Sequence, residues 1–233
     1  MIYKKWEHHL DGNIELRPIE LAGRGSRIQD PLYKDFNDMV EDVFHQIKAE
    51  ISCGSYALFG HSLGSLICYE LVEKIKEHRL SRPDHIFFSG RGVPHIPDAS
   101  EISLHLLDHE EFKDELINLG GTPPEFFDHP ELAELFLPLL RNDFKMAESF
   151  EFHGEVCRYD GNVTVFLGKD DEATAEQYHG WKDYTSKLCN IIYFNGGHLF
   201  LHDEMENIAH FINQTLSVRN YFPSKKMKLS KSS

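Results

Sequence analysis

The sequence predicts an α/β protein in which a mostly parallel central sheet is flanked by helices. Short apolar runs alternate with segments whose apolar residues recur every three or four positions, as expected for parallel strands joined by helices. One apolar run ends at Phe59 and a helical segment starts at Leu63, so a tight turn joins this strand to its helix. A long helical stretch then interrupts the alternation in the middle of the chain.

The individual elements follow from the same patterns. Five apolar runs are expected to be strands, at residues 13–20, 55–59, 84–89, 163–167 and 190–194. Helical periodicity predicts helices over residues 36–51, 63–79, 175–187 and 204–216. In the first helix the predicted buried face consists of Phe36, Met39, Val40, Val43, Phe44, Ile47 and Ile51.

The interrupting stretch, residues 98–150, is helical in pattern, rich in acidic residues and broken by Gly-Gly-Thr-Pro-Pro at 120–124. A helical insertion between two strands is typical of a lid over an active site, although a decorative subdomain would give the same pattern. The predicted organisation is a core formed by residues 1–97 and 151–220, a lid over 98–150, and a basic tail, 221–233, expected to be disordered.

Composition limits the function. A formal net charge of −14 argues against nucleic acid as a partner, because phosphates would be repelled. No apolar run approaches the ~18 residues that span a bilayer, so no membrane association is expected. The cysteines Cys53, Cys68, Cys157 and Cys189 form no CxxC pair and are expected to be reduced thiols of a cytoplasmic protein. Since no metal-spaced cluster or phosphate-binding glycine loop occurs, we expect no cofactor.

The turn between strand and helix reads Gly60-His61-Ser62-Leu63-Gly64, which matches G-x-S-x-G. In this setting the motif is typical of a nucleophile elbow of the α/β-hydrolase fold, where tight packing is expected to require both glycines. A serine hydroxyl needs a histidine base and an orienting carboxylate, which follow later strands in the order acid, then histidine. His198 follows the last predicted strand, and Asp170 and Asp171 compete for the acid; the usual Gly-x-x-Asp loop favours Asp171.

Seven segments resemble the type II thioesterases that accompany nonribosomal peptide and polyketide synthetases. They are ELAGRGSR (20–27), FGHSLGSLICYEL (59–71), FFSGRGVPH (87–95), LGGTPPEFF (119–127), LPLLRNDFKMAESF (137–150), FLGKDDE (166–172) and NGGHLFL (195–201). The resemblance implies Ser62 as nucleophile, Asp171 as acid and His198 as base. It also implies hydrolysis of misprimed short acyl or aminoacyl thioesters on the phosphopantetheine arm of acyl or peptidyl carrier domains.

Four charged residues in the matching segments, Arg24, Arg91, Arg141 and Asp143, are expected to form structural ion pairs. At the start of the chain, the segment from Met1 resembles the helix after the family's first strand and oxyanion loop. The backbone N–H of Leu63 is then one expected oxyanion donor, and the second is absent from this chain. We therefore expect a missing first strand, from either an internal start in a longer reading frame or a damaged enzyme.

Two rival functions fit the same motifs. A carboxylesterase or lipase acting on small esters would use the same three residues, and only the lid segments argue against it. A truncated, non-catalytic relative that binds carrier proteins is favoured by the absent oxyanion loop and disfavoured by the intact Ser-His-Asp set. In each case we expect a monomer.

Overall fold

The computed structural model describes residues 2–52, 54–96, 102–122, 124–171 and 175–220. Cys53, the tail at 221–233 and the start of the predicted lid at 98–101 lie outside these residues. The chain forms two compact units, one made of Met1–Pro18 with Leu201–Ser233 and the other of Ile19–Phe200. Every residue that the sequence analysis assigned to catalysis belongs to the second unit.

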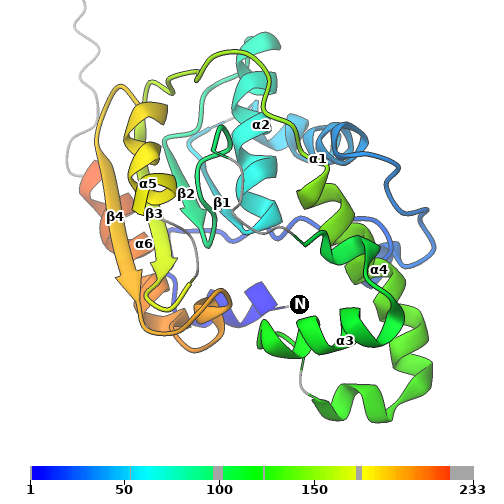
Figure 1. Ribbon diagram of the computed structural model, residues 1–233. Helices are drawn as coiled ribbons and strands as arrows, with labels where there is room; N and C mark the ends of the chain where they lie inside the picture. Colours follow the sequence, from blue (N-terminus) through cyan, green and yellow to red (C-terminus); the bar gives the residue numbers. More distant parts are fainter. Residues whose placement is uncertain (1, 53, 97–101, 123, 172–174, 221–233) are drawn as a thin grey trace, which may run out of the picture. The chain divides into compact units, whose positions relative to one another are not determined.

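The second unit contains a four-stranded parallel sheet in the order β1-β2-β3-β4 (Figure 1). Its strands are β1 (Ala57–His61), β2 (His85–Ser89), β3 (Asn162–Gly168) and β4 (Cys189–Phe194). In this register His61 lies opposite Ser89, and Gly168 lies opposite Phe194. The loops that follow all four strands therefore leave the sheet along one edge, as the parallel prediction required.

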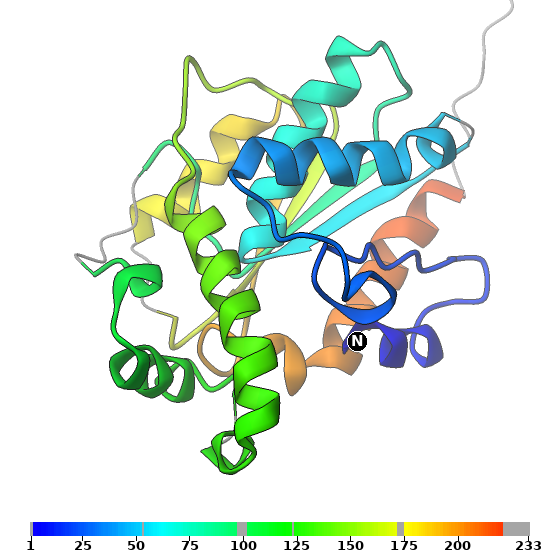
Figure 2. The same cartoon turned by 90° about the vertical axis from the view of Figure 1, so that its right-hand side faces the viewer.

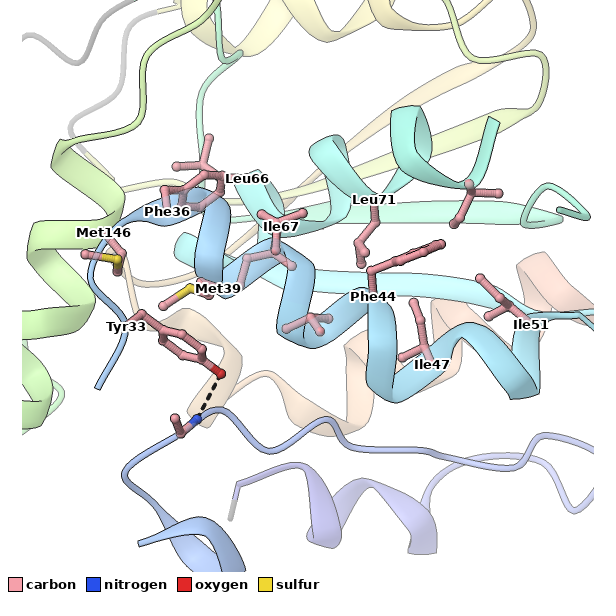
Figure 3. Close-up of a cluster of buried hydrophobic side chains, with 14 residues drawn as sticks. Tyr33, Phe36, Met39, Phe44, Ile47, Ile51, Leu66, Ile67, Leu71 and Met146 are labelled. Carbon is pink, nitrogen blue, oxygen red and sulfur yellow. Dashed lines mark hydrogen bonds between the residues drawn. The ribbon is translucent and has the colours of Figure 1, made fainter. Parts of the chain in front are cut away.

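Helices α1 (Phe36–Ile51) and α2 (Leu63–Glu77) pack together through one apolar cluster (Figure 3). All seven residues predicted for the buried face of α1 are buried. The Asp35 side chain caps this helix by accepting a hydrogen bond from the Asp38 N–H at 2.9 Å. The same cluster contains Met146, so the end of the predicted insertion is anchored in the core beside α1.

The predicted insertion is helical within the described residues. It contains the short 3-10 turns η3 (Leu104–Leu106) and η4 (Pro124–Asp128), together with α3 (His109–Asn118) and α4 (Pro130–Glu148). Phe112, Leu116 and Leu137 form the centre of its own apolar cluster. Helices α3 and α4 lie on the side of the sheet where the strands end at their carboxyl termini (Figures 1 and 2).

Two predicted elements differ from the structure. Residues 13–20 form no strand, in keeping with Pro18, which has no N–H to donate to a sheet. The helix predicted over 175–187 is divided into α5 (Ala175–His179) and the 3-10 turn η5 (Gly180–Tyr184). The division lets Trp181 turn inward and stack on Phe88 of β2, with ring centroids 4.0 Å apart.

The first unit contains the 3-10 helix η1 (Ile2–His8) and the closing helix α6 (Met205–Asn220), and the short turn η6 (Phe200–His202) begins at its boundary. The Asn213 side chain joins this unit by accepting from the Asp11 N–H at 3.0 Å and donating to the His9 carbonyl at 2.9 Å. Among all described helices, none combines the length and apolar character needed to cross a membrane.

Candidate active site

Ser62 sits at a sharp turn between β1 and α2. Its φ of 52° and ψ of −116° put a non-glycine residue in a region that costs about 1–3 kcal/mol of strain. The surroundings hold this geometry, since the Ser62 N–H donates to the Ser89 carbonyl at 2.8 Å and the Ser65 N–H donates to the Ser62 carbonyl at 2.9 Å. Strain retained at a half-buried turn residue such as Ser62 is a feature of functional sites.

The two glycines of G-x-S-x-G are not equivalent. A Cβ on Gly60 would overlap the Gly64 carbonyl and lie 2.7 Å from the backbone nitrogen of Ser65, so only glycine fits. A Cβ on Gly64 would meet nothing within 4 Å. The expectation that packing requires both glycines is therefore wrong for Gly64, because its Cα faces open space.

Below the turn, the Ser65 hydroxyl is completely buried and joins three backbone segments. Its Oγ lies 2.8 Å from the Gly60 carbonyl and 3.0 Å from the Ser89 carbonyl, and it accepts a hydrogen bond from the Ser89 N–H at 3.0 Å. The end of β1, the start of α2 and the end of β2 are thus tied together. Sequence reasoning missed Ser65 and Ser89; both lie inside segments that carried the family resemblance.

The structure brings Ser62, His198 and Asp171 together. His198 follows β4 through a turn in which Gly196 has a φ of +102°. Its Nε2 lies 3.0 Å from Ser62 Oγ, and its Nδ1 lies 3.4 Å from Asp171 Oδ2. The first distance suits proton transfer between the hydroxyl and the imidazole. The second is at the long end for an N–H···O bond.

The two competing carboxylates occupy different surroundings. The side chain of Asp171 is 13% exposed and faces His198, whereas Asp170 is exposed. The Asp170 backbone contributes instead, because its N–H donates to the Gly196 carbonyl at 3.1 Å. The acid loop and the base loop are therefore joined through their backbones.

Leu63 is the first residue of α2, directly after Ser62. Its N–H belongs to the first turn of a helix, where backbone donors lack partners within the helix and carry partial positive charge. This position suits the oxyanion role predicted for it. The absence of a second oxyanion donor from this chain stays a prediction from the sequence.

The charged residues of the matching segments have different contacts. Arg24 and Asp143 form the predicted ion pair at 2.7 Å, and burial raises the pKa of Asp143 while its hydrogen bond from Arg24 acts in the opposite direction. Arg141 instead donates to backbone carbonyls, including those of His105 at 2.8 Å and Leu107 at 2.6 Å. Arg141 thus joins backbone segments within the insertion, so the ion-pair prediction is wrong for this residue. The role of Arg91 stays a prediction.

The described part of the chain contains no group of three or more His, Cys, Asp or Glu side chains arranged to hold a metal ion.

A strained serine on a strand-turn-helix, within hydrogen-bond distance of an imidazole, defines a serine hydrolase of the α/β-hydrolase fold. Residues 1–216 match the family model described as "Thioesterase domain", and the chain belongs to this family. The sequence-based resemblance to thioesterases is thereby confirmed.

Similar proteins include biosynthetic enzymes. The chain is 31% identical to the gramicidin S biosynthesis protein GrsT of Aneurinibacillus migulanus, covering 92% of this chain and 83% of GrsT. It is 32% identical to a protein of Brevibacillus parabrevis named linear gramicidin dehydrogenase LgrE, covering 92% of this chain and 82% of LgrE. The crystal structure of ClbQ from the colibactin NRPS/PKS pathway has a TM-score of 0.88 and 34% identity, covering 94% of this chain and 92% of ClbQ.

Proposed function

We propose that this chain is a type II thioesterase that removes misprimed short acyl or aminoacyl groups from the phosphopantetheine arms of acyl or peptidyl carrier domains. The catalytic residues in this proposal are Ser62, His198 and Asp171, with the Leu63 N–H as an oxyanion donor. The observation that carries it is the 3.0 Å distance from Ser62 Oγ to His198 Nε2 at a strained elbow. Similarity to ClbQ and GrsT supports the pathway class.

In the first half-reaction Ser62 Oγ attacks the thioester carbonyl carbon while His198 Nε2 accepts the hydroxyl proton. The carbonyl oxygen becomes negatively charged and is stabilised by the Leu63 N–H. The carbon–sulfur bond then breaks, His198 returns the proton to the pantetheine sulfur, and an ester remains on Ser62. Asp171 orients the imidazole and stabilises its positive charge.

In the second half-reaction water attacks the carbonyl carbon of the ester while His198 accepts a proton from the water. The ester bond breaks, Ser62 Oγ recovers a proton, and the acyl group leaves as a carboxylic acid. Neither half requires an oxidant or reductant. Although LgrE is named a dehydrogenase, the Ser62–His198 arrangement of this chain suits acyl transfer to water.

The state of the thiols supports the setting that we propose for the reaction. Cys68, Cys157 and Cys189 are unpaired with one another, and burial raises the pKa of Cys68 to about 12 and of Cys189 to about 11. Protonated thiols oxidise slowly. We place the enzyme, as a monomer, in the cytoplasm beside its synthetase.

The test follows loss of an acetyl group from acetyl-phosphopantetheinyl peptidyl carrier domain, with wild type, Ser62→Ala and no enzyme. The proposal requires loss that depends on Ser62. A parallel reaction with a small oxygen ester separates the thioesterase from an esterase, since an esterase would favour the free ester over the carrier-bound thioester. Carrier binding without any turnover would instead indicate the non-catalytic relative.

A further inference from the structure

His61, the residue before the nucleophile, lies against the imidazole of His198. The two ring centroids are 5.2 Å apart with an interplanar angle of 52°. Phe200 also packs against the His61 ring, with centroids 5.7 Å apart and an angle of 69°. The His198 ring therefore rests on a neighbouring imidazole that is itself held by an aromatic side chain.

Ser89, the last residue of β2, sets the position of His61. It is completely buried, and its Oγ lies 2.9 Å from His61 Nδ1. The backbone of the same residue holds the elbow, because its carbonyl accepts from the Ser62 N–H at 2.8 Å. One residue thus fixes both the backbone of the nucleophile and the ring beside the base.

Gly90 leaves the space that this arrangement needs. Its φ is +58°, and a Cβ at this position would lie 3.0 Å from His61 Nδ1 and closer still to Cε1. A larger residue would displace the His61 ring from its place between Ser89 and His198. Glycine at position 90 therefore leaves room for the His61 ring, because it has no side chain.

We propose that Ser89 and His61 are positioning residues that hold the His198 imidazole at hydrogen-bond distance from Ser62 Oγ. The inference rests on the proposed function. Asp171 lies 3.4 Å from His198 Nδ1, a distance at which its hydrogen bond restrains the ring weakly. The ring contact with His61 supplies a second restraint, and the Ser89 hydroxyl acts on His198 only through His61.

A double-mutant cycle tests this chain of contacts with Ser89→Ala, His61→Ala and the double variant, using the acetylated carrier domain. Because misplacing a reacting group by about 1 Å can lower a rate ~10²-fold, we expect each single variant to lose at least ~10-fold in kcat. KM should change by less than about twofold, since neither residue is proposed to bind substrate. The double variant should be no slower than His61→Ala, since Ser89 acts through His61.

Thr164→Val is the matched control. It removes another buried hydroxyl that bonds an imidazole, since Thr164 Oγ1 lies 2.9 Å from His85 Nε2. His85 and Ser89 occupy opposite ends of β2, about 13 Å apart at the usual rise of a strand. Thr164→Val and Ser89→Ala should lower the thermal midpoint alike, whereas only Ser89→Ala should lower kcat.

A fluorophosphonate that labels Ser62 provides a readout without a thioester substrate. If wild type labels rapidly and both Ser89→Ala and His61→Ala label equally fast, the positioning proposal is overturned while the proposed function stands. Fully additive kcat losses in the double variant would also overturn it. Wild type that neither labels at Ser62 nor deacylates the carrier would overturn the proposed function together with it. His61→Asn, which keeps a polar group near Ser89 but lacks the ring, replaces His61→Ala if that variant does not fold and should lose a similar factor in kcat.

Discussion

Gly168→Ala should move the loop after β3, which carries Asp171, away from the loop after β4, which carries His198. Gly168 ends β3, and a Cβ there would lie 2.6 Å from the Gly196 carbonyl oxygen and closer still to that of Gly197. Both obstacles are backbone, so no side-chain rotation relieves them. Restoring an ordinary 3.4 Å contact to the nearer oxygen, that of Gly197, requires the 196–197 segment to move by about 1.0 Å.

The displaced segment leads directly into His198. The His198–Asp171 distance is already 3.4 Å, so a shift of this size takes it outside hydrogen-bond range. It also strains the hydrogen bond from the Asp170 N–H to the Gly196 carbonyl, which is 3.1 Å long. A displacement near 1 Å at a reacting group predicts a loss of ~10²-fold in kcat.

The assay compares carrier deacylation and fluorophosphonate labelling of wild type, Gly168→Ala and Gly12→Ala. The Gly12 position serves as the control because a Cβ there would meet nothing within 4 Å. Gly12→Ala should match wild type in both reactions. If Gly168→Ala folds and keeps kcat within about threefold of wild type, the predicted displacement of residues 196–197 is wrong, because the loops then tolerate the methyl group without moving.

Three further predictions concern packing, pH and the lid. Gly64→Ala should change the free energy of unfolding by less than about 1 kcal/mol in urea titrations, whereas Gly60→Ala should cost several times more or prevent folding; equal losses would contradict the packing at the elbow. Burial would raise the pKa of Asp42, but hydrogen bonds, led by the one from Arg27, hold that pKa below its ordinary value. The ionised carboxylate therefore stabilises the fold above the ordinary Asp pKa, and this stability is lost as the pH falls through the lowered pKa. Asp42→Asn should therefore flatten the fall in unfolding free energy below pH ~4, at a cost of about 2 kcal/mol at neutral pH, and an unchanged slope would contradict this. The Arg141 guanidinium bonds several carbonyls and lies 4.2 Å from the centre of the Phe112 ring, which a lysine side chain cannot reproduce. In Arg141→Lys, limited proteolysis should therefore cut the 102–122 segment faster without a matching fall in the thermal midpoint. Unchanged cleavage would show that Arg141 does not hold the predicted lid together.

The sequence predicted those parts of the site that depend on order along the chain. The passage from Phe59 through Ser62 into a helix, and the loops carrying Asp171 and His198 after later strands, follow from local pattern and parallel topology. A strand-end position brings such residues to one edge of the sheet whatever the details of packing. This is why Ser62, Asp171 and His198 could be expected to lie close together from the sequence alone.

Contacts between distant segments could not be predicted in this way. The hydroxyl of Ser89 meets His61 only because β1 and β2 pair in one register, and serine at a strand end gives no pattern that predicts it. The open space around Gly64 is likewise a property of three-dimensional packing. The strand predicted over 13–20 was wrong, and the segment contains Pro18, which has no N–H to donate to a sheet.

In the proposed mechanism an acyl group passes from the carrier to Ser62 before water releases it. The most direct measurement mixes the acetylated carrier domain with the enzyme, quenches the reaction in acid at short times and maps the acetyl group by peptide mass spectrometry. We expect acetylation of the peptide that contains Ser62, formed and lost at rates that match carrier deacylation, and no deacylation by Ser62→Ala. Deacylation that proceeds in Ser62→Ala at the wild-type rate would contradict it.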